Sequence, residues 1–256
     1  MDFTGKSVIV TGASVGMGRE IAVRFAGLGA KVLVNYASAK DSAKETAAII
    51  TNAGGTAVLC RADVSREADA DRLAAVAVGE FGKIDILVNN AGVTSFIPFS
   101  DLDAAGAEVW TKLYATNVMG AFFCARAAAR EMKKTGGGVI VNNASVAGQR
   151  PSGSSIPYCA SKAALIQLTN CLAATLGPDI RVNSVSPGVI ADTRWNAGRP
   201  GYDPEQAHKT GAELSLLKRT GTSADVAGAV LFLASDEAAF CTGIDIRVDG
   251  GRYYKV

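Results

Sequence analysis

Short strand-like runs alternate with longer helical segments along most of the chain, and this alternation limits the possible folds more than any other feature. Runs rich in Val and Ile predict strands at 7–11, 31–36, 56–64, 83–92, 139–145, 180–188 and 244–251. Apolar runs joined by helical crossovers are typical of a parallel sheet that is buried on both faces. Because such crossovers are right-handed, the expected fold class is α/β: one doubly wound parallel β-sheet of the Rossmann type, with helices on both faces, over residues 1–256.

One segment departs from the alternation. Residues 189–221 contain Trp195, Pro200 and Tyr202 and are too irregular to be an ordinary crossover helix. Long connections in compact domains are often lids or binding loops, although a disordered loop gives the same pattern. We therefore expect a substrate lid at 189–221. A single long helix is expected over about 103–134.

Composition and charge argue against several classes of protein. Hydrophobic residues make up 48% of the 256 residues, and the net charge is only +2, without a basic patch for nucleic acid or a membrane surface. No apolar run approaches the roughly 20 residues of a membrane-spanning helix, and the chain begins without a signal-peptide pattern. Five cysteines without a CxxC pair, and a lone His208, predict reduced core thiols and no metal site. We expect a cytoplasmic protein.

A glycine-rich turn follows the first predicted strand. The stretch TGASVGMG places Gly12, Gly16 and Gly18 directly before a helix. Glycine lets the backbone approach a ligand, and a helix N-terminus offers unpaired N–H groups to phosphate. The spacing differs from the usual G-x-G-x-x-G, and a simple tight turn is the alternative. Its place after the first strand favours a dinucleotide site.

The end of the second predicted strand bears on which dinucleotide binds. An acidic side chain here would accept a hydrogen bond from a free ribose 2′-hydroxyl and repel a 2′-phosphate. The sequence NYASAK contains no acid before Asp41, and Asn35, Ser38 and Lys40 are compatible with a phosphate. NADP(H) is therefore the preferred cofactor. NAD(H) is the alternative, because no arginine ends the strand and because Val15 occupies a turn position where a basic residue would help to bind a 2′-phosphate.

Tyr158 and Lys162 lie four residues apart in YCASK, in line with Leu165 and Leu172 of the same predicted helix. Residues at this spacing are neighbours on one helix face. A nearby ammonium favours the phenolate and lowers the pKa of a tyrosine, as a general acid or base needs. An ordinary amphipathic pair is the alternative. Ser145 ends the fifth predicted strand, from which it can reach a substrate oxygen.

These motifs occur in a fixed order: TGASVGMG at 11–18, NNAG at 89–92, Asn117, Ser145, YCASK at 158–162 and PGVIADT at 187–193. Together, from about Ser7 to Gly251, they resemble the short-chain dehydrogenase/reductase family, in its short single-domain branch similar to 3-oxoacyl-carrier-protein reductases.

The resemblance implies four catalytic residues. Tyr158 would donate a proton to the carbonyl oxygen during reduction, and Lys162 would lower the pKa of Tyr158 and hydrogen-bond the nicotinamide ribose. Ser145 would hold the substrate oxygen, and Asn117 would anchor a water that relays protons. The cofactor would supply the hydride.

The resemblance also implies contacts with the cofactor. Met17 stands where the family more often has isoleucine. The cofactor-binding residues expected are Gly12, Ser14, Val15, Gly16, Met17, Asn35, Tyr36, Ala37, Ser38, Asp63, Val64, Asn90, Ala91, Gly92, Tyr158, Lys162, Pro187, Gly188, Ile190 and Thr193.

The expected function is an NADP(H)-linked oxidoreductase that interconverts a ketone or aldehyde and the corresponding alcohol. The alternatives are a non-catalytic dinucleotide-binding regulator and an NAD-preferring alcohol or sugar dehydrogenase of the same family. Trp195 and Tyr202 suggest an apolar or aromatic small-molecule substrate, and burial of both side chains beneath the lid without ligand contact is the alternative. The resemblance implies a homotetramer in which the segments 103–134 and 155–176 pair across one interface.

Overall fold

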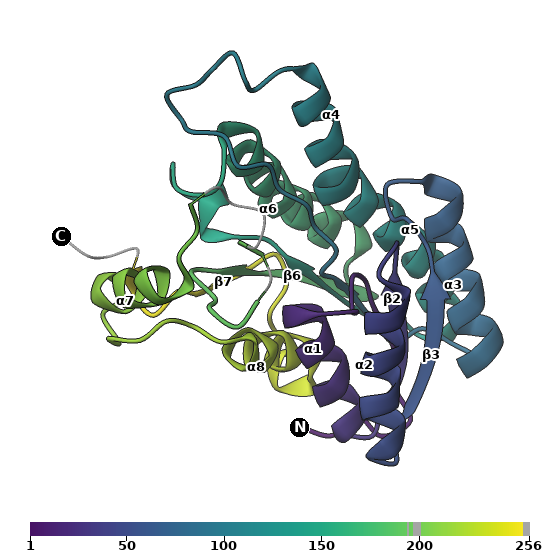
Figure 1. The fold of residues 1–256 in the computed structure, drawn as a ribbon. Helices are drawn as coiled ribbons and strands as arrows, with labels where there is room; N and C mark the ends of the chain where they lie inside the picture. Colours follow the sequence, from purple (N-terminus) through teal and green to yellow (C-terminus); the bar gives the residue numbers. More distant parts are fainter. Residues whose placement is uncertain (194, 197–200, 253–256) are drawn as a thin grey trace.

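Seven parallel strands form one sheet at the centre of the computed structural model, which describes residues 1–193, 195–196 and 201–252 (Figure 1). The strands are β1 (Ser7–Val10), β2 (Lys31–Tyr36), β3 (Thr56–Arg61), β4 (Ile86–Asn89), β5 (Gly138–Asn143), β6 (Ile180–Pro187) and β7 (Asp245–Val248). Their order is β3-β2-β1-β4-β5-β6-β7, and every neighbouring pair is parallel. The predicted fold class is confirmed, and each strand lies inside its predicted run except β5, which begins one residue earlier.

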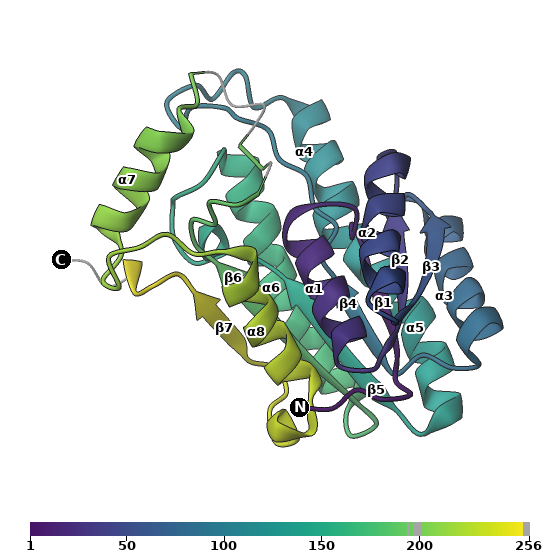
Figure 2. The same cartoon turned by 60° about the horizontal axis from the view of Figure 1, so that its bottom comes forward.

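Helices cover both faces of the sheet. One face carries α1 (Gly16–Gly27), α2 (Lys40–Asn52) and α8 (Ser223–Ala234), which lie side by side (Figure 2). The other face carries α3 (Glu67–Phe81), α4 (Ala107–Tyr114), α5 (Ala121–Met132) and α6 (Ile156–Leu176). A further helix, α7 (Pro204–Leu214), stands away from the sheet beyond the end of β6.

The side chains of each strand alternate between two hydrophobic cores. On β1, Val8 and Val10 pack with Phe25 of α1, whereas Ile9 between them packs with Leu73 of α3. Successive residues of a strand point to opposite faces, so a run of apolar residues fills both cores. This burial explains why the strands are continuous apolar runs and do not alternate with polar residues.

The helix predicted over 103–134 is interrupted. It begins at Ala107, and a π-helical turn at Ala115–Gly120 separates α4 from α5. Gly120 lies so close to the chain after β3 that a Cβ atom on it would be 2.9 Å from Cγ2 of Val64. The extra residue of a π-turn changes which side chains face the sheet, and a helical period alone gives no sign of it.

Two further differences concern the second half of the chain. The segment 189–221 contains the eleven-residue helix α7, capped by Asp203, and an isolated bridge between Ile190 and Gly221 joins its ends. Residues 194 and 197–200 of this segment lie outside the described residues. Helix α8 was not among the predicted helices, although Thr222 and Asp225 form a capping box at its start.

All five cysteines are free, but only two are buried, so the prediction of core thiols is wrong for the exposed Cys171. Among the described residues, none of the helices combines the length and the hydropathy needed to cross a membrane.

Candidate active site

The candidate site lies where the winding of the sheet reverses. Strand β1 has β2 on one side and β4 on the other, so the loops after β1 and β4 leave the sheet in different directions. The side chain of Asn90, just after β4, bridges them: its Nδ2 donates to the carbonyls of Thr11, at 2.9 Å, and Gly12, at 3.1 Å. Ligands of open α/β sheets bind at such a switch point.

The glycine-rich loop has the shape of a phosphate cradle. Gly12 and Gly16 have φ of +61° and +56°, a region that favours glycine. A Cβ atom on Gly18 would lie 2.3 Å from the carbonyl oxygen of Gly12, so the loop can fold back on the helix only with glycine there. Helix α1 begins at Gly16 after Val15, and no side chain caps it. Its first N–H groups therefore suit the pyrophosphate of a dinucleotide.

The remaining residues of this loop lie where such a cradle needs them. Ser14 is buried, and its carbonyl accepts hydrogen bonds from Arg19 and from Thr46 of α2. Met17 lines the adjoining cavity, and Thr193 covers the loop: a Cβ atom on Gly16 would be 3.5 Å from Cγ2 of Thr193.

The structure corrects the expected role of Asn35. Its side chain is 1% exposed and is engaged within the protein: Oδ1 accepts from the Gly12 N–H at 3.0 Å, and Nδ2 donates to the Ala62 carbonyl at 2.9 Å. Asn35 therefore braces the glycine loop from below and has no group left for a ribose phosphate. Tyr36 is likewise part of the hydrophobic core.

Residues 37–40, which follow β2 at this end, are all exposed, and they include the predicted contacts Ala37 and Ser38. A cationic side chain that is not part of the β2 sequence lies beside them. Arg61, at the end of the adjacent strand β3, donates from Nε to the carbonyl of Ala37 at 3.2 Å. The pairing of Tyr36 with Arg61 across the two strands brings this guanidinium to the position where the sequence of β2 offers no arginine.

Asp63 and Val64 follow β3 on the same edge. The carboxylate of Asp63 is exposed and accepts from the N–H of Ser65 at 3.0 Å, whereas Val64 is buried in the core. Ala91 lies against the glycine loop, because a Cβ atom on Gly12 would come within 2.9 Å of the Cα atom of Ala91.

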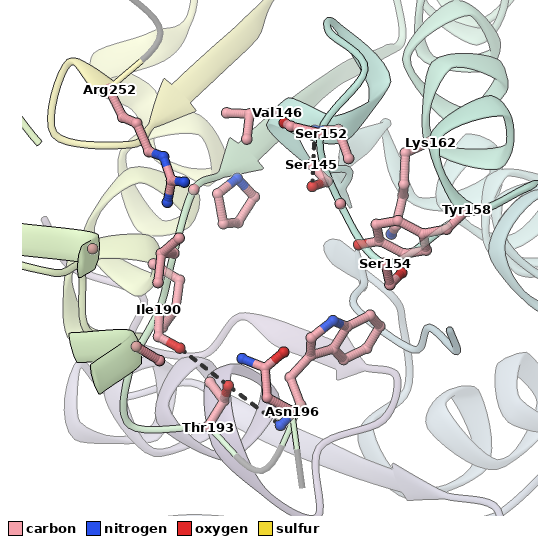
Figure 3. A pocket seen from close by; sticks show the side chains of 18 of the residues that line it. Ser145, Val146, Ser152, Ser154, Tyr158, Lys162, Ile190, Thr193, Asn196 and Arg252 are labelled. Atoms are coloured by element: carbon pink, nitrogen blue, oxygen red, sulfur yellow. Dashed lines mark hydrogen bonds between the residues drawn. The ribbon is translucent and has the colours of Figure 1, made fainter. Parts of the chain in front are cut away.

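A cavity of about 620 Å³ opens beside the cradle, at the carboxyl ends of β4, β5 and β6 (Figure 3). It brings together ten of the predicted site residues: Met17, Asn90, Gly92, Ser145, Tyr158, Lys162, Pro187, Gly188, Ile190 and Thr193. The predicted residues on the adenosine side, from Gly12 to Val64, do not line this cavity, apart from Met17.

Helix α6 carries Tyr158 and Lys162 into one wall of the cavity. Ser155 caps the helix by accepting from the Tyr158 N–H at 3.3 Å, which places both residues in its first two turns. Both are buried, at 7% and 4% exposure, and share a face with the buried Leu165 and Leu172. Figure 3 shows the ring of Tyr158 reaching into the cavity, with Ser145 on the adjacent wall. Nζ of Lys162 donates to the Asn143 carbonyl at 2.8 Å.

Burial shifts both pKa values. It raises the pKa of Tyr158 to about 12, although a hydrogen bond with Ser145 acts in the opposite direction. Burial also lowers the pKa of Lys162 to about 8. The direction for Tyr158 is opposite to the expected lowering. Nζ of Lys162 is 5.9 Å from the centre of the Tyr158 ring and is held by Asn143, so its charge offsets little of the burial.

Asn117 lies behind this wall and not in the cavity itself. It sits in the π-helical turn and is 1% exposed; its amide pairs with both backbone groups of Val93, at 2.9 and 3.0 Å, and donates to Oγ of Ser161 at 3.0 Å. A Cβ atom on Gly92 would be 3.4 Å from Oδ1 of Asn117 and 3.7 Å from Nζ of Lys162. Asn117 therefore joins the loop after β4 to α6 beside the lysine.

Several residues that line the cavity were not predicted from the sequence. Asn143 holds Lys162 and donates to Oδ1 of Asn90 at 2.9 Å, while its own buried Oδ1 has no partner among the described residues. Two arginines, Arg150 and Arg252, also line the cavity. Two consecutive asparagines at the end of an otherwise apolar strand are a signal that could have drawn attention to Asn143, whereas the arginines carry no local signal.

The chain resembles known proteins over almost its full length. A family profile described as Enoyl-(Acyl carrier protein) reductase matches residues 12–252. The "Granaticin polyketide synthase putative ketoacyl reductase 2" of Streptomyces violaceoruber is 43% identical over 96% of this chain and 95% of that protein. The L-rhamnose 1-dehydrogenase (NAD(P)(+)) of Azotobacter vinelandii is 37% identical over 97% and 96%. A solved structure of a short-chain type dehydrogenase/reductase from Mycobacterium marinum is 36% identical, with a TM-score of 0.87 over 98% of this chain and 96% of that one.

Proposed function

Since this chain belongs to the short-chain dehydrogenase/reductase family, whose members are oxidoreductases that use NAD(P) cofactors, we propose that it interconverts a ketone or aldehyde and the corresponding alcohol. The observation that carries this proposal is the grouping of Ser145, Tyr158 and Lys162 around one cavity that adjoins the glycine cradle. A protein that only sensed a dinucleotide would need the cradle and not these three side chains.

The dinucleotide would bind along the glycine loop and the end of β4, and its nicotinamide would supply or accept the hydride. Ser145 holds the substrate oxygen by hydrogen bonding, and Tyr158 donates its proton to that oxygen as negative charge develops. Lys162, whose Nζ is 5.9 Å from the centre of the tyrosine ring, contributes a small part of the stabilisation of the phenolate left after proton transfer. Its hydrogen bond to Asn143 fixes it there.

The pKa shifts support a role in reduction. With a pKa of about 12, Tyr158 is protonated at neutral pH and is ready to donate. Lys162, with a pKa of about 8, is still mostly charged at pH 7. Oxidation of an alcohol would need the phenolate form and is expected to become faster as the pH rises.

Tyr158→Phe tests the mechanism. This variant lacks only the acidic proton, so turnover of a ketone panel with NADPH should fall by roughly 10²–10⁴-fold, the usual contribution of a general acid. Its affinity for NADPH, measured by fluorescence titration, should stay close to that of the wild type. Tyr114→Phe, outside the cavity, is the matched control. Substantial turnover by Tyr158→Phe would rule out the assigned proton donor, and wild-type NADPH binding without turnover of any carbonyl would favour the regulator.

We further propose that NADP(H) is preferred over NAD(H). Ser38 is exposed at the end of β2, no acid precedes Asp41 in the sequence after β2, and Arg61 supplies a cation beside Ala37. These features support binding of a 2′-phosphate. One relative is described with NAD(P)(+) as its cofactor, so a preference for NAD(H) is the alternative against which the NADP(H) proposal is tested.

Ser38→Asp tests this preference. A carboxylate at this position would repel a 2′-phosphate and accept from a 2′-hydroxyl, so we expect NADPH affinity to fall by about tenfold or more while NADH affinity holds or rises. Ser100→Asp, on an exposed loop away from the site, is the control. Unchanged NADPH affinity in Ser38→Asp would place the 2′-phosphate elsewhere or favour NAD(H).

Three broader expectations remain proposals. The segment 189–221 acts as the substrate lid, supported by the contact between Trp195 and Tyr158, whose ring centres are 5.7 Å apart. A homotetramer is supported by exposed apolar side chains on the segment 103–134, among them Met119 and Phe122. The five free cysteines agree with a reducing compartment such as the cytoplasm.

A further inference from the structure

The charged side chains that line the cavity are mostly cationic. Among the residues that the structure describes, they are Arg150, Lys162, Asp203 and Arg252. The acid of this described set, Asp203, is engaged at the start of α7, where its Oδ1 accepts from the N–H groups of Glu205 and Gln206 at 2.9 and 3.2 Å. Lys162 belongs to the proposed proton transfer. The two arginines have no part in that chemistry.

Arg252 is the arginine whose side chain is visibly directed into the cavity (Figure 3). Its Nε is buried and has no hydrogen-bond partner among the described residues. No ion pair involving Arg252 is present in the described part of the chain; the charge of the Asp249 carboxylate raises its pKa through space. Burial and the neighbouring Arg150 both lower the pKa of Arg252. A cation in these surroundings is stabilised by an anion that enters the cavity.

Arg150 holds this arrangement together. Its Nη1 donates to the Arg252 carbonyl at 3.3 Å, and its Nε donates to Oγ of Ser152 at 3.1 Å. A hydrogen bond between Gln149 and Asp245 ties the same loop to β7. The loop after β5, which carries Ser145, and the chain after β7, which carries Arg252, are therefore fixed to each other.

The position of Arg252 assigns the anion to the substrate and not to the cofactor. The phosphate cradle follows β1, Ser145 follows β5, and Arg252 follows the edge strand β7. Along the sheet, Arg252 thus lies beyond the catalytic serine, on the side away from the glycine loop. The nicotinamide ring carries no anionic group, so a negative charge that reaches Arg252 comes from the molecule being reduced.

We propose that the carbonyl substrate carries a carboxylate, which Arg252 binds while Ser145 and Tyr158 hold the carbonyl oxygen. The substrate class is then an oxo acid, with an apolar chain between its two polar ends that passes Val146 and Ile190. This inference rests on the proposed carbonyl reduction. The contact between Arg252 and the carboxylate would hold the substrate at a second place, which orients the substrate and determines the distance between its carboxylate and its carbonyl group.

The test compares acids with their methyl esters. NADPH-linked reduction of 4-oxopentanoate and 5-oxohexanoate is measured beside the methyl ester of each. A charge-assisted hydrogen bond typically changes affinity by roughly 10–100-fold, so the wild type should prefer at least one acid over its ester by about tenfold or more in kcat/KM.

Substitution of Arg252 should remove this preference. In Arg252→Gln the KM for the acid should rise by about tenfold or more with kcat nearly unchanged, the ester should be unaffected, and Arg252→Lys should restore part of the loss. Arg130→Gln, an exposed arginine on α5, should behave as the wild type. Binding of 4-oxopentanoate to the nucleotide-free protein, measured by calorimetry, should weaken in parallel with the rise in KM.

Other outcomes separate the two proposals. Equal kcat/KM for acids and esters in the wild type, or an equal loss for both in Arg252→Gln, would overturn the carboxylate site while leaving carbonyl reduction intact. If neither acids nor esters are reduced, the ketone panel decides the proposed function, and calorimetry alone decides the anion site: binding of 4-oxopentanoate that depends on Arg252 supports it, and binding independent of Arg252 overturns it.

Discussion

At the scale of single residues, Lys162 shows what the fold imposes on a buried charged group. It lies on the buried face of α6, where an uncharged side chain would be more stable. Its hydrogen bond to the Asn143 carbonyl holds the ammonium in place without neutralising it. The residue thus reduces the stability of the folded chain in order to serve the site.

This cost has a pH dependence that can be measured. The pKa of Lys162 falls from its ordinary 10.5 to about 8 on folding. Between these pH values the unfolded chain binds more protons than the folded chain. The contribution of Lys162 to the free energy of unfolding is therefore lowest below pH 8 and rises up to pH 10.5. Lys162→Met removes the effect. The free energy of unfolding of Lys162→Met minus that of the wild type should therefore be larger at pH 7 than at pH 10, by on the order of 2–3 kcal/mol.

Urea unfolding of the nucleotide-free protein at the two pH values gives this difference. Loss of the hydrogen bond to Asn143 destabilises the variant equally at both pH values and cancels in the comparison. An equal gap between variant and wild type at pH 7 and pH 10 would show that Lys162 keeps its ordinary pKa in the folded protein.

Asn35 shows why a residue at a predicted site need not touch the ligand. Sequence position placed it at the end of β2, where the cofactor is expected. Its neighbours in space are the Gly12 N–H and the Ala62 carbonyl, which come from β1 and β3. Those contacts depend on strand order, which the residues around Asn35 do not specify.

At the scale of elements, the π-helical turn between α4 and α5 is the main departure from a regular pattern. It turns Asn117 inward to Val93 and Ser161, and Gly120 allows the turn to approach Val64. Such turns are common at functional sites because they re-aim side chains that a regular helix would direct elsewhere.

Gly120→Ala tests the importance of this close approach. The added Cβ would be 2.9 Å from Cγ2 and 3.0 Å from the carbonyl oxygen of Val64, so the variant should lose about 1–3 kcal/mol of stability. Gly79→Ala in α3 is the matched control, because nothing lies within 4 Å of its added Cβ; there the better helix propensity should raise stability by about 0.5–1 kcal/mol. Thermal or urea unfolding of both variants measures the contrast, and equal effects would mean that the turn can move away from Val64 without loss.

At the scale of the whole molecule, large apolar side chains remain exposed on the single chain. Met119 is 48% and Phe122 is 39% exposed on the segment expected at a subunit interface, and the side chain of Phe240 is fully exposed. Exposed apolar groups gathered on one surface are typical of an interface with another chain.

Light scattering coupled to gel filtration tests the proposed assembly. We expect a mass four times the 26.3 kDa of one chain. Phe122→Asp, which would place a charge in the interface, should shift the protein to smaller species, while Lys133→Asp at the exposed end of α5 should not. A wild-type protein of monomer mass would refute the tetramer.

The sequence by itself determined the parallel sheet, the glycine cradle and the pairing of Tyr158 with Lys162, because hydrophobic period, glycine spacing and the i, i+4 relation are local properties. The tertiary structure alone decided which side chains meet across elements. Asn35 was expected to contact the cofactor, but it lies on β2 between β1 and β3 and supports the glycine loop instead. Arg61 contacts Ala37 because β3 pairs with β2. Arg252 lies at the cavity that Tyr158 and Lys162 line because β7 adds to the edge of the sheet beyond β6. Contacts between distant segments follow from strand order and packing, which no short stretch of sequence encodes.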